Sequence, residues 1–250
     1  MSDSSLIDSF GRIHKNLRIS VTDRCNIRCF YCMPEVVKFL PRKDVLTFEE
    51  ITRITRIFAS VGIERIRLTG GEPLARRGLS DLVAMLKKID GIKEIAATTN
   101  GLLLADQAVG LREAGLDRLN VSLDTLDADR FQKITLRNGL GQVIAGIEAA
   151  QEAGFDNIRM NAVAIAGLTE TDIIPLAKFA RHRALELRFI EFMPLDGDQQ
   201  WDSKSVMTGS SIRQTIEREI GPLVEADRKI ASQPAADFSC LLYTSPSPRD

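Results

Sequence analysis

The sequence predicts an α/β fold, namely an open, partial (β/α)6 barrel of the TIM type with a polar lumen. Three observations lead to this prediction. Six short β-branched runs alternate with amphipathic helical stretches between residues 17 and about 220. Within these runs polar and apolar side chains alternate. A cluster of three cysteines directly follows the first run, where a barrel of this type carries its catalytic loops.

The composition is that of an ordinary folded protein. Of the 250 residues, 44% are hydrophobic and 27% are charged. The formal net charge is −1, so nothing global favours nucleic acid or an anionic membrane as a partner. The sequence shows neither a signal peptide nor an 18-residue apolar span, and we therefore expect a cytoplasmic protein.

The six predicted strands have the spacing of consecutive β–α units. They cover residues 17–23, 64–70, 94–100, 118–124, 157–165 and 186–193. Parallel strands joined by right-handed helical crossovers would make three quarters of an eight-unit barrel. The predicted organisation is an N-terminal extension at 1–16, the partial barrel at 17–220, the start of a C-terminal segment at 221–239 and an unrelated or artefactual tail at 240–250. The stretch 226–238 is expected to be a loop.

Helix signals lie between the strands. Thr47 and Glu50 form a capping-box pattern before a helix that should bury an apolar stripe. The members of this stripe are Ile51, Ile54, Ile57 and Phe58. Ser80 is predicted to cap the second helix, and Gly115 to end the third.

The strands are expected to bury one face only. Leu17 and Ile19 alternate with Arg18 and Ser20, and the later strands repeat this pattern. The apolar face must pack against the helices, so the polar face must line the lumen. Burying arginine, threonine and asparagine in a dry core is costly, and we therefore expect a wet lumen that receives a polar ligand.

The strongest chemical signal is the segment DRCNIRCFYCMPE. Its cysteines, Cys25, Cys29 and Cys32, have the spacing C-x3-C-x2-C. Cysteine thiolates are the usual ligands of iron–sulfur clusters. Two alternatives remain: a zinc site completed by Cys240, or three cysteines without a metal. Zinc sites, however, favour paired C-x2–4-C units.

This spacing, with Tyr31 before the third cysteine and LTGGEP at 68–73, resembles the radical S-adenosylmethionine (SAM) superfamily. The resemblance implies a 4Fe-4S cluster held by three thiolates, with one open iron that chelates the amino and carboxylate groups of SAM. An electron from the cluster would cleave SAM to methionine and a 5′-deoxyadenosyl radical. Adjacent glycines let backbone approach a ligand closely, which suits the SAM amino group.

Longer blocks between residues 8 and 238 resemble the GTP 3′,8-cyclase family, which starts molybdenum cofactor biosynthesis. These blocks are FGR, LRISVTDRCNIRCFYCMPE, RLTGGEPLARR, TTNGLLL, RLNVSLDTLD and RFIEFMPLDG. The resemblance implies a lyase that takes hydrogen from C3′ of GTP and joins C3′ to C8, giving 3′,8-cyclo-7,8-dihydro-GTP. The implied partners are a reductant protein, a downstream cyclic pyranopterin monophosphate synthase and a second copy in a homodimer.

The family's contacts carry over onto matching positions. The implied SAM contacts are Tyr31, Gly71, Ser122 and Met193, and Met193 is expected to share its strand's face with Glu191. The implied GTP contacts are Arg18, Arg67, Thr98 and Arg159. The family more often has lysine at the position of Arg159. Arginine keeps the positive charge of lysine, but its geometry is not equivalent. For each arginine the alternative is a salt bridge within the open barrel wall. Arg76 and Arg77 are expected on a solvated loop.

The chain departs from the family in its cysteines. The family carries a second 4Fe-4S cluster near its C-terminus, ligated by three further cysteines and binding guanine. Only Cys240 follows Cys32, so those ligands are absent and we expect a C-terminally truncated chain. One rival interpretation is a radical SAM enzyme with another substrate. The other is a fragment that binds cluster and SAM without cyclase activity. No side chain is assigned as an acid or base.

Overall fold

A six-stranded parallel sheet forms the centre of the computed structural model, which describes residues 6–34, 36–194, 201–226 and 236–240. The strands follow one another in the order β1 to β6, each paired in parallel with the next. They are β1 (Asn16–Ser20), β2 (Arg65–Thr69), β3 (Glu94–Thr99), β4 (Arg118–Ser122), β5 (Arg159–Ala164) and β6 (Glu186–Glu191). This confirms the six predicted strands. Only β1 reaches outside its predicted range, by one residue at its start.

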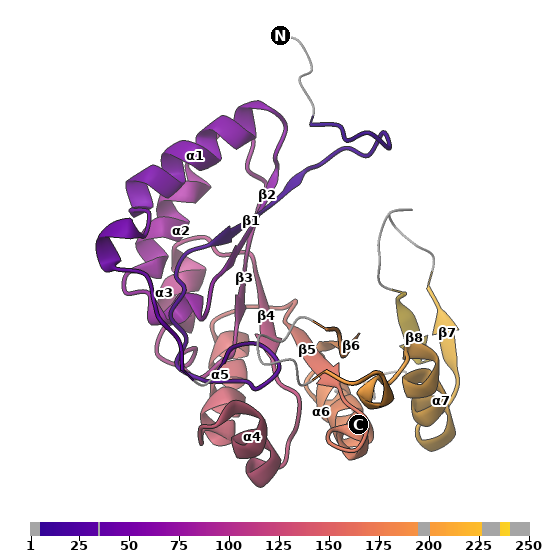
Figure 1. Ribbon diagram of the computed structural model, residues 1–250. Helices are drawn as coiled ribbons and strands as arrows, with labels where there is room; N and C mark the ends of the chain where they lie inside the picture. Colours follow the sequence, from indigo (N-terminus) through magenta and orange to yellow (C-terminus); the bar gives the residue numbers. More distant parts are fainter. Residues whose placement is uncertain (1–5, 35, 195–200, 227–235, 241–250) are drawn as a thin grey trace.

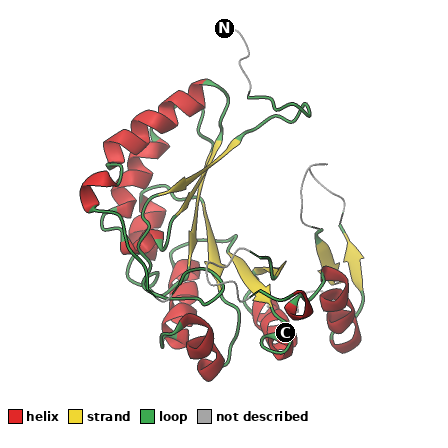
Figure 2. Cartoon of the chain, viewed as in Figure 1, coloured by secondary structure: helices red, strands yellow, loops and turns green. Residues whose placement is uncertain are grey.

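The helices line one side of this curved sheet, and its other side stays open (Figures 1 and 2). They are α1 (Phe48–Ser60), α2 (Leu79–Lys87), α3 (Ala108–Glu113), α4 (Ala128–Thr135), α5 (Leu140–Glu152) and α6 (Ile173–His182). Short 3-10 turns occupy Arg42–Asp44, Pro73–Ala75, Glu170–Asp172 and Ser203–Ser205. None of the helices in the described ranges is both long and apolar enough to cross a membrane.

The hydrophobic core lies between the sheet and these helices. Ile66 and Leu68 of β2 and Val121 of β4 are buried in it. Residues of the opposite face stand beside one another across the strands, because Arg18 pairs in register with Arg67, and Thr98 with Asn120. The alternation predicted from the sequence therefore separates an apolar, helix-covered face from a polar, open face.

The C-terminal part adds α7 (Gly209–Glu219) and a separate two-stranded sheet. Ile212 of α7 and Met207 join Ala164 and Ile173 in a second small core. Strand β7 (Leu223–Glu225) pairs antiparallel with β8 (Phe238–Cys240). The prediction of a loop up to 238 is therefore wrong at Phe238, because pairing with β7 makes this residue part of a strand. Strand β8 also includes Cys240, where the predicted tail begins. Residues 241–250 of the predicted tail lie outside the described residues.

The helix predictions are only partly confirmed. The capping box of Thr47 and Glu50 is present, and Gly115 follows α3 with a φ of +97°. Ser80 lies inside α2, which is preceded by Gly78 instead. The predicted stripe on α1 is wrong for two of its four members. Ile54 and Ile57 are 38% and 59% exposed, whereas Ile51 is buried and Phe58 packs against the core.

Two threonines take the buried place on α1. Thr52 and Thr55 are buried beside Ile51, although threonine carries a polar hydroxyl. Their hydroxyls donate to the carbonyls of Phe48 and Ile51, at 2.7 and 2.8 Å. Because these hydrogen bonds satisfy the polar group, the threonines can be buried at little cost, while Ile54 and Ile57 face outward.

Candidate active site

The three predicted ligands lie on the long loop between β1 and α1, called the cysteine loop here (residues 21–47). Cys25 and Cys29 are half-buried, and Cys32 is exposed. The backbone N–H groups of Arg28 and Phe30 donate to the carbonyls of Thr135 and Ile134, so the end of α4 supports the loop. The N–H of Cys32 donates to the carbonyl of Cys29 at 2.9 Å, which closes a turn between these two cysteines.

The three thiols lie near enough to influence one another. Burial raises the pKa of Cys25, Cys29 and Cys32. The charge of Cys32 raises the pKa of both Cys25 and Cys29 further. The free thiols are therefore protonated at neutral pH, and binding of iron must release their protons.

The donor set fits an iron–sulfur cluster better than a single ion. Within the described ranges, no group of three His, Cys, Asp or Glu side chains is arranged to hold one metal ion. Strand β8, which ends at Cys240, lies beside β7 and apart from the cysteine loop (Figure 1). A zinc ion would need its ligands around one centre, whereas a cluster gives each thiolate its own iron.

The GGEP turn after β2 packs directly against the start of the cysteine loop. A Cβ added at Gly71 would lie 2.4 Å from the carbonyl oxygen of Arg24, and one at Gly70 would lie 2.4 Å from that of Thr22. The N–H of Gly71 donates to Thr22 at 2.7 Å, and that of Glu72 donates to Arg24 at 2.8 Å. These glycines are required because backbone meets backbone here.

Glu72 and Asn100 belong to the site, although the sequence analysis assigned them no role. The Glu72 carboxylate is buried and accepts hydrogen bonds from the Thr99 hydroxyl and the Asn100 N–H, both at 2.7 Å. Burial raises the pKa of Glu72 while these hydrogen bonds lower it. The Asn100 amide nitrogen donates to Asn26 at 2.7 Å and lies 3.9 Å from the sulfur of Cys25. The sequence signal for both residues was their position, since Asn100 directly follows β3 and Glu72 lies three residues after β2, at the edge where barrels hold their sites.

Tyr31 fastens the cysteine loop to the end of β4. Its hydroxyl donates to Asp124 at 2.5 Å, and Asp124 also accepts from the N–H of Val163 at 2.8 Å. Burial raises the pKa of Asp124 to about 6, against the effect of these hydrogen bonds. A small cavity lies beside this pair, and Cys29 and Ser122 also line it. The fold thus brings the predicted SAM contacts Tyr31 and Ser122 together next to Cys29, a predicted cluster ligand.

Arginines gather on the polar face of the sheet, and five of them are called the arginine group. They are Arg18, Arg67, Arg118, Arg159 and Arg188. Burial and then the charges of the other four members lower the pKa of Arg67. The members therefore act on one another electrostatically and create a strongly positive region.

Carboxylates neutralise only part of the arginine group. Glu186 pairs with Arg159 at 2.8 Å and with Arg188 at 2.5 Å, and Glu94 pairs with Arg118. Arg159 thus forms a salt bridge within the barrel wall, the alternative that the sequence left open for each arginine. Arg18 and Arg67 make no ion pair with any described residue. Thr98, another predicted GTP contact, lies on the same face and accepts from Asn120 at 3.3 Å.

Two further expectations need correction. Met193 does not share a strand face with Glu191, because β6 ends at Glu191 and Met193 follows it, 50% exposed. Arg76 is not a solvated loop residue. Its guanidinium donates to the carbonyls of Val21 and Leu46, at 2.5 and 2.6 Å, and lies over the ring of Phe48. Arg77 is exposed, as predicted.

Known proteins share both the sequence and the fold of this chain. Residues 19–180 match the family model described as Radical SAM superfamily. A GTP 3′,8-cyclase of Rhodopirellula baltica is 52% identical over 94% of the chain and 66% of its own length. A GTP 3′,8-cyclase of Pelotomaculum thermopropionicum is 44% identical over 91% of the chain and 70% of its own length. The chain thus spans about two thirds of the length of these relatives.

A solved structure supports the fold independently. The structure of Streptococcus suis SuiB bound to S-adenosylmethionine superposes with a TM-score of 0.63 at 19% identity. The match covers 75% of this chain and 43% of that one.

Proposed function

The chain belongs to the radical SAM superfamily and, within it, to the GTP 3′,8-cyclase family, and on this premise we propose that the whole protein converts GTP to 3′,8-cyclo-7,8-dihydro-GTP. The observation that carries the proposal is that Arg18 and Arg67, which form no ion pair with a described residue, lie side by side on β1 and β2, and that the cysteine loop directly follows β1. The triphosphate of GTP binds where positive charge is concentrated. The cofactor that the cysteines hold must lie beside the reacting atoms of the nucleotide.

The cysteine loop supplies the cofactor site. Cys25, Cys29 and Cys32 would hold a 4Fe-4S cluster, whose chemistry is the reductive cleavage of SAM. The turn at Gly71 fixes the start of the loop, and the Tyr31–Asp124 hydrogen bond fixes its middle. Gly71, Tyr31, Ser122 and Met193 would contact SAM. Their task is to hold the ligand in one orientation and keep water away from it.

The polar face supplies the substrate site. Arg18 and Arg67 would bind the triphosphate, with Thr98 beside them and Arg159 sharing its charge with Glu186. A guanidinium forms charge-assisted hydrogen bonds with phosphate oxygens, and the mutual repulsion within the arginine group would be relieved by the anion. No acid or base is needed from a side chain for the first hydrogen transfer, so the residues act by positioning.

The remaining parts of the proposal concern the whole protein. A second 4Fe-4S cluster, absent from these 250 residues, would bind guanine. The protein would act in the cytoplasm, receive electrons from a reductant protein and pass its product to a cyclic pyranopterin monophosphate synthase. A homodimer is part of the same proposal.

Reconstitution without oxygen tests the cofactor site directly. We expect about four irons per chain, because three thiolates hold one cluster. Cys29→Ala should lose the iron and its visible absorbance but keep the far-ultraviolet circular dichroism, because Cys29 is not among the residues of the hydrophobic core. Ser60→Ala, on an exposed end of α1, serves as the control. Tightly bound zinc with negligible iron would contradict the assignment.

The reaction itself is tested in the whole protein. Reconstituted enzyme, SAM, GTP and a reductant should give 5′-deoxyadenosine and the cyclised nucleotide together. Formation of 5′-deoxyadenosine with some other substrate, and none with GTP, would favour the rival interpretation of a different radical SAM enzyme.

A further inference from the structure

A cluster of cations surrounds the outer side of the cysteine loop, and the proposed reaction uses none of them. This basic patch consists of Arg24, Arg28 and Lys38 on the loop and Arg137 just after α4. Arg24, Lys38 and Arg137 are exposed, and Arg28 is half-buried. The whole chain has a formal net charge of −1, so the patch is a local feature.

Hydrogen bonds and ring contacts hold the patch together. The guanidinium carbons of Arg24 and Arg28 lie 5.5 and 5.3 Å from the ring centroid of Phe39, the residue that follows Lys38. Arg28 also donates to the carbonyls of Cys25 and Ile27. Because the loop backbone at Arg28 is bonded to Thr135, Arg137 belongs to the same surface.

No described carboxylate neutralises the patch. None of its four members makes an ion pair with a described residue. Asp23 is adjacent in sequence, but one of its oxygens accepts from the N–H of Leu40 at 2.6 Å and the other is buried. Among the described residues, positive charge therefore predominates on this surface, where it can attract a negatively charged partner.

Exposed apolar side chains lie among these cations. Val36 is 90% exposed, Leu40 53% and Leu136 41%. Val36 and Leu40 belong to the cysteine loop, and Leu136 precedes Arg137. Apolar side chains with charged residues around them are the composition of small, transient protein interfaces.

We propose that the basic patch is the docking surface for a small acidic electron-transfer protein that reduces the cluster at Cys25, Cys29 and Cys32. The inference rests on the proposed function, which requires an external electron. Cys32, the exposed ligand, lies in the loop that carries the patch, so a partner docked there stands beside the cluster. One electron leaves the partner and enters the cluster, and no bond or proton changes place. Opposite charge would speed this encounter, and the small area would let the partner leave after transfer.

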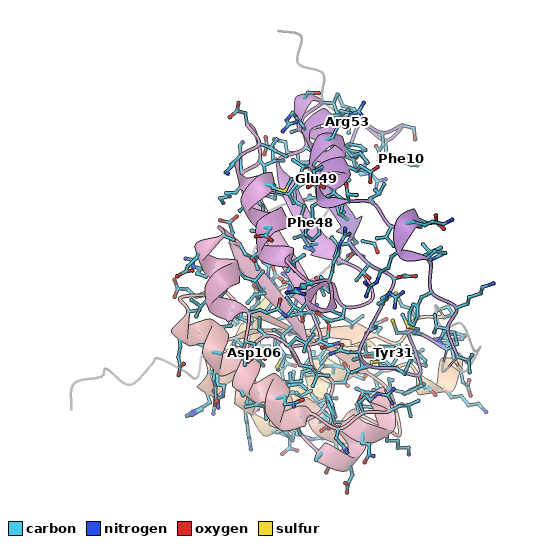
Figure 3. All side chains as sticks on the ribbon, turned by 90° about the vertical axis from the view of Figure 1, so that its left-hand side faces the viewer. Phe10, Tyr31, Phe48, Glu49, Arg53 and Asp106 are labelled. Carbon is cyan, nitrogen blue, oxygen red and sulfur yellow. The ribbon has the colours of Figure 1, made fainter. Side chains whose placement is uncertain are left out.

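The test uses two charge-reversal variants of the reconstituted chain, with reduced bacterial flavodoxin as the acidic probe. The patch variant combines Arg24→Glu, Lys38→Glu and Arg137→Glu, and leaves Arg28 intact because it supports the cysteine loop. The control combines Arg53→Glu, Arg56→Glu and Lys88→Glu, exposed cations on α1 and after α2. Both variants change the net charge equally. Arg53 lies well apart from Tyr31 of the cysteine loop (Figure 3).

Two readouts are needed: flavodoxin binding by titration calorimetry, and the stopped-flow rate of cluster reduction. At low salt the patch variant should bind flavodoxin at least about tenfold more weakly than the control. Its cluster should also be reduced at least about tenfold more slowly. The difference should shrink at high salt, where screening shortens the range of the charges. Reduction by photoreduced 5-deazaflavin, a small neutral reductant, should be equal in both variants.

The outcomes separate the docking surface from the proposed function. Equal flavodoxin binding and equal reduction rates in both variants, each carrying a full cluster, would overturn the docking surface. A wild-type chain that takes up no iron would instead overturn the proposed function. A patch variant that loses 5-deazaflavin reduction as well would show damage to the cluster site, and this too would contradict a docking role.

Discussion

Single side chains with several hydrogen bonds hold the cysteine loop in place. Glu72 connects the GGEP turn to the end of β3, Asn100 reaches from there to the cysteine loop, and Asp124 holds Tyr31. All three side chains are buried, so a lost partner would leave a buried polar group unsatisfied. The loop is long and carries no helix before Arg42, which makes it dependent on these contacts for one defined shape.

The Tyr31–Asp124 contact should be measurable by a double-mutant cycle. Tyr31→Phe and Asp124→Asn should each lower the free energy of unfolding by about 1–3 kcal/mol, because each leaves a buried group with too few partners. The double variant should lose less free energy of unfolding than the two single variants together, because both residues take part in the same hydrogen bond. Urea unfolding of the four proteins measures this coupling. Strict additivity would contradict a direct hydrogen bond between the two residues.

Arg18 and Arg67 should each contribute to binding of GTP in the whole protein. Losing one charge-assisted contact should weaken binding by roughly 1.5–3 kcal/mol in Arg18→Ala and in Arg67→Ala. Arg77→Ala removes an exposed loop arginine and should leave the affinity unchanged, since an isolated surface charge contributes little. Calorimetric titration with GTP compares the three variants. Wild-type affinity in both lumenal variants would refute the assignment.

Elements are brought together at this site by close backbone contact. The GGEP turn after β2 and the start of the cysteine loop after β1 approach so closely that side chains cannot fit between them. Parallel strands make this possible, because neighbouring carboxyl ends leave the sheet side by side. The position of the cysteine loop is therefore set by a turn about 45 residues later in the sequence.

Gly71→Ala should disturb this contact. Its Cβ would lie 2.4 Å from a backbone oxygen, so either the turn or the cysteine loop must shift, at a cost of about 1–3 kcal/mol. Gly141→Ala in α5 is the control, because no atom lies within 4 Å of its added Cβ. Alanine favours a helix over glycine, so the control should be more stable by about 0.4–1 kcal/mol. Urea midpoints measure both changes. Equal stability of Gly71→Ala and wild type would mean that the turn relaxes freely.

The molecule as a whole is a sheet covered on one face only. Helices α1 to α6 bury the apolar face, while the arginine group stays on the open face (Figures 1 and 2). Charged groups on such a face remain hydrated, and a ligand or a further segment can reach them. The chain spans about two thirds of the length of its relatives, and after Cys32 it contains a single cysteine, Cys240.

Residues 1–250 should therefore separate the two halves of the reaction. We expect reductive cleavage of SAM, because the three cysteines and the residues around them are present. We expect no cyclised nucleotide, because these residues lack the three further cysteines of the proposed second cluster, and GTP would lose that part of its proposed binding site. A displacement of reacting atoms by about 1 Å can already cost about a hundredfold in rate.

The assay quantifies 5′-deoxyadenosine and the cyclised nucleotide separately, under anaerobic conditions with SAM, GTP and dithionite. The whole protein is the matched control and should form both products. Robust cyclised product from residues 1–250 would show that this chain needs no second cluster.

Short-range patterns were enough to predict the strands and the cysteine site. Alternating polar and apolar residues define which face of a strand is buried, and C-x3-C-x2-C places three thiols within one loop. All six strands of the parallel sheet and the capping box on α1 follow from such local signals. Arg18 and Arg67 were likewise predicted on the polar face, because each stands between apolar residues of its strand.

Only the tertiary structure determined which polar groups form hydrogen bonds and ion pairs with one another. Whether an arginine is paired depends on a neighbouring strand. Arg159 forms an ion pair with Glu186, whereas Arg67 forms none with a described residue and is affected by the charges of other arginines. Likewise the partners of Glu72, Asp124 and Arg76 lie far away in the sequence. Hydrogen bonds and ion pairs act over a few ångströms in space, whereas periodicity reports only the local chain. The sequence by itself therefore determined the sheet and the candidate ligands, and folding decided which charges remain available for a substrate.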